Sequence, residues 1–167
     1  EALRLLAATE HQRKNYTASA ALCAEFLSKH GDTPSAAEVR FLAAENSLLA
    51  SDSAGAVAAY RSFLTDFPSD AQANKAKFRL GLTLHTLGRD AEASPYLDAL
   101  TSFTSGERSF CPVHLALGDI AFSAEDWATA ERHLNSYTTC DGDEPVDDAW
   151  LKLGIALQRQ ERHGDAL

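Results

Sequence analysis

Apolar side chains recur at helical spacing along the chain, and the same pattern returns about every 37 residues. Between Phe78 and Leu100, an apolar helical stripe is followed by Gly88 and then by a second stripe with a small residue at its centre. Equivalent positions lie 37, 37, 37 and 36 residues apart, at Leu6, Ala43, Leu80, Leu117 and Leu153. Self-similarity at this period predicts an array of antiparallel helical hairpins.

Small residues stand at two fixed places in every repeat. The residue after each equivalent position is alanine or glycine, namely Ala7, Ala44, Gly81, Gly118 and Gly154. Thirteen residues after each position comes another small side chain, namely Ser19, Ala56, Ala93, Ala130 and Ala166. Small residues allow two helices to approach closely, whereas a bulky side chain there would force the hairpin apart. The pattern therefore predicts one tight hairpin contact per repeat.

Turn and capping signals divide the chain into helices. Turns are expected at Asn15–Tyr16, at Ser51–Ser53, at Gly88 and at Glu125–Asp126. Ser35 with Glu38, and Ser69 with Gln72, have the spacing of capping boxes. We expect about nine helices plus a truncated tenth and no strands, in a single array over residues 1–167. The predicted repeats are 1–33, 34–68, 69–106, 107–144 and a truncated 145–167.

Composition narrows the function classes. Of the residues, 45% are hydrophobic and 23% are charged, which is typical of a folded chain, and the net charge is -9. A nucleic-acid surface would need a clustered basic face, so no nucleic-acid partner is expected. No apolar run approaches the roughly 18 residues of a membrane span. The chain starts within a helical pattern and has no methionine, and we therefore expect it to be a fragment of a longer protein.

The pattern resembles that of the tetratricopeptide repeat over essentially the whole chain. The residues that carry the resemblance are Trp150, Leu153 and Gly154, the Gly88 turn, Ala93, Leu97 and Pro68. Repeats 1 and 2 depart from it, with alanine in place of glycine. The resemblance implies an all-α fold, a right-handed α–α superhelix of about four and a half helical hairpins. It also implies that the first helices line a concave groove that binds proteins.

A narrower similarity concerns the long repeats. The Phe63-x-x-x-Phe67-Pro68 segment is similar to loops of bacterial envelope tetratricopeptide proteins, such as the lipoprotein partner of the outer-membrane barrel-assembly machine and the Tol–Pal coordinator. This similarity implies a periplasmic or other extracytoplasmic location, with a cytoplasmic location as the alternative.

No catalytic motif is present. The sequence has no GxSxG, P-loop, HExxH or CxxC pattern, so no enzyme, cofactor or metal site is predicted. Six histidines are scattered across the repeats, and none pairs with another at i, i+4; they are His11, His30, His85, His114, His133 and His163. We interpret them as solvated or helix-terminal, with a site assembled across repeats as the alternative.

The three cysteines differ in their expected roles. Cys23 takes an apolar position in a second helix and is expected to be a buried thiol. Cys111 starts the first helix of repeat 4, and Cys140 ends its second helix. These two ends are neighbours in an antiparallel hairpin, so a Cys111–Cys140 disulfide is geometrically plausible. Two reduced cysteines are the alternative.

The groove is the predicted site. Equivalent positions of the first helices carry Phe41, Phe78, Leu115 and Leu151, which would form an apolar ladder. The alternative is that these residues pack between repeats. The full predicted partner-binding set is Arg4, Phe41, Glu45, Lys75, Phe78, Arg79, Leu82, His85, Leu115, Asp119, Phe122, Leu151 and Ile155.

The sequence thus predicts a non-enzymatic scaffold that binds a protein or peptide in its groove. Some family members clamp a C-terminal carboxylate; Lys75 and Arg79 match that clamp, but both of its asparagines are missing, so it is rejected. Two hypotheses stay open. In the first, the segment is a structural spacer or an arm that self-associates through the array ends. In the second, it is the docking domain of a larger enzyme.

Overall fold

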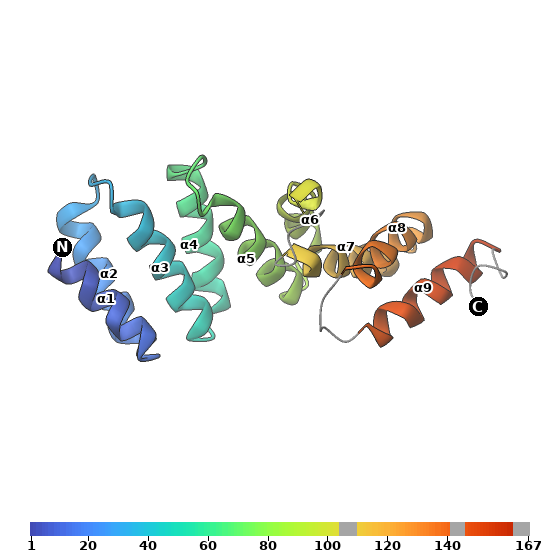
Figure 1. Cartoon of the computed structure of the whole chain (residues 1–167), viewed down its shortest axis with the longest axis horizontal. Coiled ribbons are helices and arrows are strands. Elements are labelled where there is room, and N and C mark those ends of the chain that lie inside the picture. Colours follow the sequence, from blue (N-terminus) through green and yellow to red (C-terminus); the bar gives the residue numbers. More distant parts are fainter. Residues whose placement is uncertain (104–109, 141–145, 162–167) are drawn as a thin grey trace. The chain divides into compact units, whose positions relative to one another are not determined.

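The computed structural model describes residues 1–103, 110–140 and 146–161, and this part of the chain contains nine α-helices, one short 3-10 helix and no strand (Figure 1). The elements are α1 (Ala2–Gln12), α2 (Tyr16–His30), α3 (Ala36–Leu49), α4 (Ser53–Asp66), α5 (Ala73–Thr86), α6 (Asp90–Asp98), η1 (Thr101–Phe103), α7 (Cys111–Ser123), α8 (Trp127–Thr138) and α9 (Asp147–Arg159). The all-α hairpin architecture is confirmed. The predicted repeat boundaries at 106, 107 and 144, and the small residue Ala166, lie outside the described residues.

The chain forms two compact units, Glu1–Thr83 and Leu84–Leu167, and the boundary falls within α5. In the first unit, α1 packs against α2, α2 against α3, and α3 against α4. In the second unit, α6 packs against α7, α7 against α8, and α8 against α9. Within each unit these helices therefore pack against their sequence neighbours, as expected of a repeat array. That residues 1–167 form a single array stays a prediction.

Of the small residues predicted at the hairpin contacts that the structure describes, all except half-buried Gly154 are buried. In the first unit, Ala7, Ser19, Ala44 and Ala56 are each fully inaccessible, and the Ser19 hydroxyl donates a hydrogen bond of 2.8 Å to the Ala7 carbonyl. In the second unit, a side-chain carbon added at Gly118 would lie 2.8 Å from Leu134 of α8. The two helices of a hairpin can pack closely because the side chains at these positions are small.

Each hairpin turn contains a residue in the left-handed region, where most side chains are strained. These residues have φ between 59° and 69° and repeat every 37, 37, 37 and 36 residues, at Lys14, Ser51, Gly88, Glu125 and Glu161. The backbone turn thus keeps the sequence period even though only one of the five is glycine. Glycine adopts this conformation without a steric cost.

Glycine at Ser51 and at Glu125 is therefore expected to stabilise the protein. Each substitution relieves a left-handed side chain, whose cost is about 1–2 kcal/mol, and the extra entropy of unfolded glycine offsets part of the gain. Thermal melts by far-UV circular dichroism should show a higher Tm for the double variant. A lower Tm would contradict this account of the turns.

The second helices of repeats 2 and 4 begin with equivalent aspartate caps. The Asp52 carboxylate accepts from the Gly55 amide at 2.9 Å, and the Asp126 carboxylate accepts from the Thr129 amide at 3.1 Å. Neither predicted capping box forms. Ser35 makes no side-chain cap bond to α3, and the Glu38 carboxylate forms an ion pair with Arg4. Before α5, the Gln72 amide is satisfied by Asp70 rather than by Ser69.

A buried polar network ties the first three helices together. Asn46 of α3 is 1% exposed, and its amide nitrogen donates to the Ser19 hydroxyl at 2.8 Å. Its carbonyl oxygen lies 2.7 Å from His11 Nδ1, which places the donated proton on that ring nitrogen. Nearby Cys23 is fully buried, as predicted, and burial raises the pKa of its thiol to about 11.

Replacing Asn46 with alanine is expected to lower the urea midpoint by the equivalent of about 1–3 kcal/mol, because a buried donor or acceptor loses its partner. Asn135→Ala, at an exposed position of α8, is the matched control, with an expected change within about 0.5 kcal/mol. Unfolding followed by far-UV circular dichroism measures both, and equal midpoints would refute the network's role.

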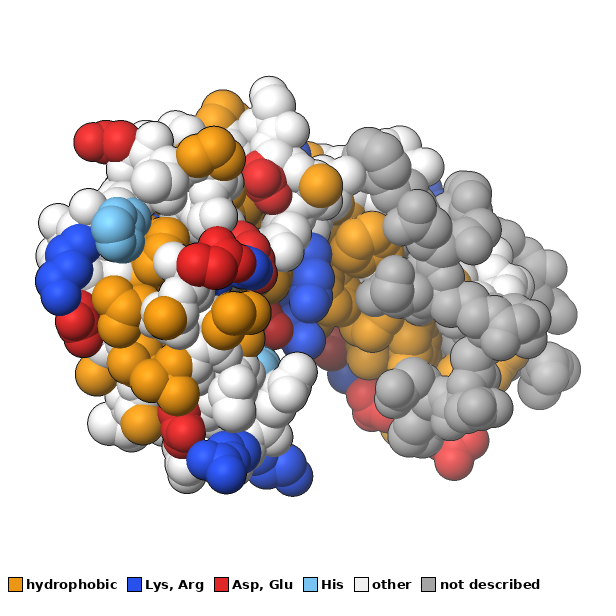
Figure 2. All heavy atoms as spheres, turned by 60° about the vertical axis from the view of Figure 1, so that its left-hand side comes forward, with side chains coloured by type: hydrophobic (Ala, Val, Ile, Leu, Met, Phe, Trp, Pro, Cys, Tyr) orange, Lys and Arg blue, Asp and Glu red, His pale blue; other side chains and the backbone are white. Residues whose placement is uncertain are grey.

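Among the equivalent apolar positions, Leu6 is exposed. Leu6 is 48% exposed, and the adjacent Leu5 is 54% exposed. The face of α1 that packs against the core carries Leu3 and Ala7, which lie in one cluster with Cys23. Leu5 and Leu6 therefore lie outside that face. Figure 2 shows hydrophobic side chains at the surface among charged ones near the N-terminal end. Within the described helices, none has the length and apolarity that a bilayer crossing needs.

Candidate functional site

Ion pairs engage the charged side chains predicted for the first unit's groove. Arg4 donates at 2.9 Å to both carboxylate oxygens of Glu38, joining α1 to α3. The Tyr60 hydroxyl donates to Glu45, and the Arg79 guanidinium Nε lies 3.3 Å from the same carboxylate oxygen. Burial, with the Glu45 carboxylate, raises the pKa of Tyr60 above its usual value, so the phenol stays a donor. These groups connect helices α3, α4 and α5.

Phe41 does not offer its ring to a partner. It is only 5% exposed and makes edge contacts with Tyr60 and Phe63 at centroid distances of 6.0 and 5.6 Å. Lys75 further covers it, with its ammonium 5.1 Å from the ring centroid. The expected place of Phe41 in an apolar ladder is therefore not met, because the aromatic residues of α4 enclose the ring.

The other predicted positions near the unit boundary are partly enclosed. Phe78 and Leu82 are half-buried on α5. In the second unit, His85 Nδ1 lies 2.7 Å from a carboxylate oxygen of Asp90, so this imidazole is engaged across the turn between α5 and α6. The sequence pattern placed these residues on the first helix correctly, but their neighbours decide how much of each is accessible.

In the second unit, the structure brings predicted Asp119 of α7 together with a lysine of α9. The Lys152 ammonium lies 2.9 Å from Asp119 of α7 and 2.5 Å from Asp148 of α9. Partial burial alone would lower the pKa of Lys152, but the two carboxylates outweigh it and raise the pKa. This ion pair joins α7 to α9, with Lys152 and Asp148 as members that the prediction missed. Their i, i+4 spacing was the available signal.

Apolar side chains on α7, on α9 and at the start of α8 differ in how far they are exposed. Leu115 and Phe122 pack against the unit's core, and the Phe122 ring lies edge-on to Trp127 at 5.4 Å. Ile155 is half-buried. Leu151 is 64% exposed, the highest value among the exposed large hydrophobic residues, and the neighbouring Trp150 is 52% exposed. We call Trp150, Leu151 and Ile155 the α9 apolar surface.

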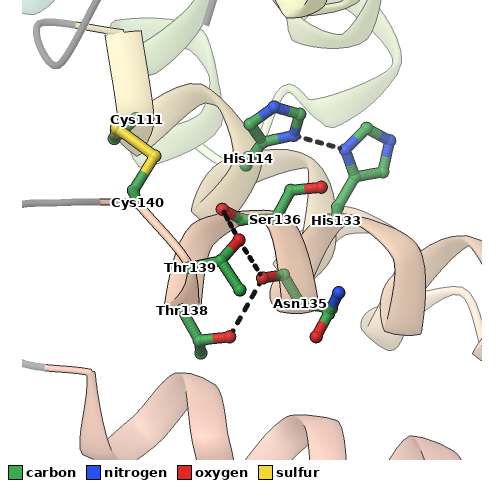
Figure 3. The surroundings of a disulfide bond; sticks show 8 residues. All are labelled: Cys111, His114, His133, Asn135, Ser136, Thr138, Thr139 and Cys140. Atoms are coloured by element: carbon green, nitrogen blue, oxygen red, sulfur yellow. Dashed lines mark hydrogen bonds between the residues drawn. A yellow bond between two sulfur atoms is a disulfide. The ribbon is translucent and has the colours of Figure 1, made fainter. Parts of the chain in front are cut away.

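A disulfide and a histidine pair lie beside each other on the hairpin of α7 and α8 (Figure 3). Cys111 and Cys140 are bonded, with their Cα atoms 6.2 Å apart. The Nδ1 atoms of His114 and His133 are 2.9 Å apart, and Arg132 donates to His133 Nε2 at 3.1 Å. Since Nε2 of His133 accepts, its proton is on Nδ1 and is donated to His114.

The interpretation of these histidines as solvated or helix-terminal is wrong for His133, which is 3% exposed. The two histidines are 19 residues apart in sequence and lie on different helices. The i, i+3 and i, i+4 spacings within one helix therefore could not reveal the pair. Within the described residues, no three metal-ligating side chains cluster. His163 lies outside the described part of the chain.

Acidification is expected to destabilise the second unit. Histidine in an unfolded chain has a pKa of about 6.5, whereas burial, with the nearby Arg132, lowers the pKa of His114 and lowers that of His133 to about 4. The unfolded state therefore binds more protons between these values, and stability falls as the pH drops from about 6.5 towards about 4. Tryptophan fluorescence reports this, because both tryptophans, Trp127 and Trp150, belong to the second unit.

His133→Gln should show a shallower loss of urea midpoint over the same pH range. His30→Gln, at an exposed position in the first unit, is the matched control and should follow the parent protein. Parallel pH profiles for all three proteins would contradict the histidine contribution.

Comparison with known proteins identifies the repeat. The family model described as tetratricopeptide repeat matches residues 49–108. No curated protein sequence matches the chain.

Among solved structures, YrrB, described as a TPR protein with an unusual peptide-binding site, is 16% identical with a TM-score of 0.78, over 99% of this chain and 79% of its own. Residues 41 to the end of MamA from Desulfovibrio magneticus RS-1 are 16% identical with a TM-score of 0.77, over 98% and 86% of the two chains. BtubC from P. vanneervenii is 15% identical with a TM-score of 0.69, over 98% and 74%. At these identities the similarity establishes the fold.

Proposed function

Since a tetratricopeptide-repeat family model matches residues 49–108 and the fold is that of such proteins, we propose that this chain binds a peptide or helical segment of a partner protein on the surface formed by the first helices of its repeats. The tetratricopeptide-repeat model that matches residues 49–108 supports a role as a protein-interaction scaffold. The observation that carries the proposal is the α9 apolar surface beside the Asp119–Lys152 ion pair between α7 and α9.

The accessible part of this surface is suited to an anchor contact. Leu151 is 64% exposed, and burying a leucine side chain against a partner contributes about 1.5–3 kcal/mol. Half-buried Ile155 and Leu115 are held by the unit's own packing, so they add contact area at little entropic cost. In the first unit, by contrast, the predicted charged groups are engaged in ion pairs, and Phe41 is buried.

The test is a pull-down from native cell extract with the parent chain, Leu151→Ser and Leu87→Ser. Leu87 is 44% exposed on the turn after α5 and is the matched control. Circular dichroism first confirms that each variant is folded. Loss of the partner with Leu151→Ser alone supports the proposal, whereas equal capture by all three proteins places the binding surface elsewhere.

Self-association through the array ends remains a second hypothesis, favoured by exposed Leu5 and Leu6 on α1 and by Trp150 on α9. Sedimentation equilibrium of the parent chain tests it. A concentration-dependent dimer that Leu5→Ser/Leu6→Ser abolishes would support this version of the function.

A further inference from the structure

The α9 apolar surface lies next to an excess of negative charge. Asp147 and Asp148 are exposed in the first turn of α9, immediately before Trp150 and Leu151. Asp148 and Asp119 share the single Lys152 ammonium, at 2.5 and 2.9 Å. Two carboxylates therefore share one ammonium, and Asp147 adds a third, exposed carboxylate in the same turn of α9.

The helix dipole does not remove this excess. The amino end of a helix carries about half a positive charge, and no side chain caps the amino end of α9. Three negative charges, one ammonium and this partial charge leave about -1.5 beside Leu151. Among the described residues of α9, the other cation is Arg159, at the far end of the helix, where its guanidinium lies 5.7 Å from the Trp127 ring centroid.

Exposed apolar and acidic groups together select the chemistry of a partner. An apolar segment gains by burying Leu151 and Trp150, and basic side chains beside it gain by pairing with Asp147 and with Asp148. A lysine or arginine can also lie over the exposed Trp150 ring, as cations do on aromatic faces. Anionic lipid surfaces and nucleic acids would be repelled by the local charge and by the net charge of -9.

We infer that the surface formed by Asp147, Asp148, Trp150, Leu151 and Ile155 binds a basic amphipathic segment of a partner protein. This inference rests on the proposed function and adds the chemical class of its partner. The segment presents apolar side chains towards Leu151 and lysine or arginine side chains towards the first turn of α9. This is a helix-in-groove or extended-peptide mode with a charge requirement.

The test uses two fluorescent 18-residue model peptides with leucines at the same helical positions, one with lysine and one with glutamate at the polar positions. Fluorescence anisotropy measures their binding to the 1–167 chain. The lysine peptide is expected to bind, and the glutamate peptide is not. Leu151→Ser should abolish binding of the lysine peptide.

The charge contribution is tested with Asp147→Asn/Asp148→Asn, which should weaken binding of the lysine peptide about 3- to 10-fold, given the usual strength of exposed charge pairs. Asp32→Asn/Asp98→Asn changes two exposed aspartates elsewhere and is the matched control for net charge. Equal weakening by both double variants, or equal binding of both peptides, would overturn the inference.

The pull-down separates this inference from the proposed function. A natural partner that is lost with Leu151→Ser but retained with Asp147→Asn/Asp148→Asn would refute the basic segment and leave the scaffold function intact. A partner retained by both variants would refute both. A dimer in sedimentation equilibrium that Leu151→Ser dissociates would show that a second copy covers the surface, which also overturns the inference.

Discussion

Gly118→Leu is expected to lower the Tm of the second unit substantially. A side-chain carbon at residue 118 would lie 2.8 Å from Leu134, which is fully buried and cannot move aside. Leucine favours the helix over glycine by about 1 kcal/mol, but overpacking a filled core costs about 1–3 kcal/mol or more. Overpacking therefore outweighs helix propensity, and tryptophan fluorescence during a thermal melt should report the loss.

The control for Gly118→Leu must add the same side chain without a clash. Arg132 is exposed, but its guanidinium contacts His133, so a leucine there would disturb the histidine pair. Ala128→Leu is better, because Ala128 is an exposed position on α8. A Tm for Gly118→Leu equal to that of Ala128→Leu would refute the close packing of α7 on α8.

Removing the Cys111–Cys140 disulfide is expected to have the largest effect on stability. The bond links residues 29 positions apart, and in the chain-entropy model a loop of this length contributes about 3–4 kcal/mol. Cys111 also packs in one core cluster with Ala149 and Leu153 of α9, and Cys140 lies against that cluster. Cys111→Ser/Cys140→Ser should therefore lower the Tm seen by tryptophan fluorescence and loosen α9.

A reductant provides the matched control for the disulfide. Dithiothreitol should lower the Tm of the parent chain and leave that of the double variant unchanged, since Cys23 is present in both and is fully buried. Mass spectrometry without reductant counts the free thiols, with one expected in the parent. Three free thiols in protein from its native compartment would refute the bond.

Local sequence signals predicted the hairpins well. The 37-residue period located each turn, and the small residues Ala7, Ala44 and Gly118 are buried where α1, α3 and α7 meet their partner helices. These features depend on residues close in sequence, for which helical spacing and turn chemistry are reliable guides. In the Ser35 capping box, Glu38 instead pairs with Arg4, 34 residues away, whereas in the Ser69 box Asp70 accepts from the Gln72 backbone amide.

The candidate site was only partly predictable. Asp119, Leu151 and Ile155 lie on the helices expected from the period, but the same pattern also selected Phe41, which α4 encloses. Accessibility depends on what packs over a side chain, and that is a property of neighbouring repeats. Lys152 was missed although its i, i+4 partner Asp148 was visible in the sequence.

The sequence by itself determined the all-α repeat architecture, the turn positions and the small helix contacts, because these follow from local periodicity and steric size. The tertiary structure alone decided the Asn46 network, the His114–His133 pair and the exposure of Leu151 beside three carboxylates. The Asn46 network and the His114–His133 pair join residues on different helices, and the exposure of Leu151 depends on what packs beside α9. Their energies arise from burial and from distances between side chains, and one helix's spacing pattern specifies neither.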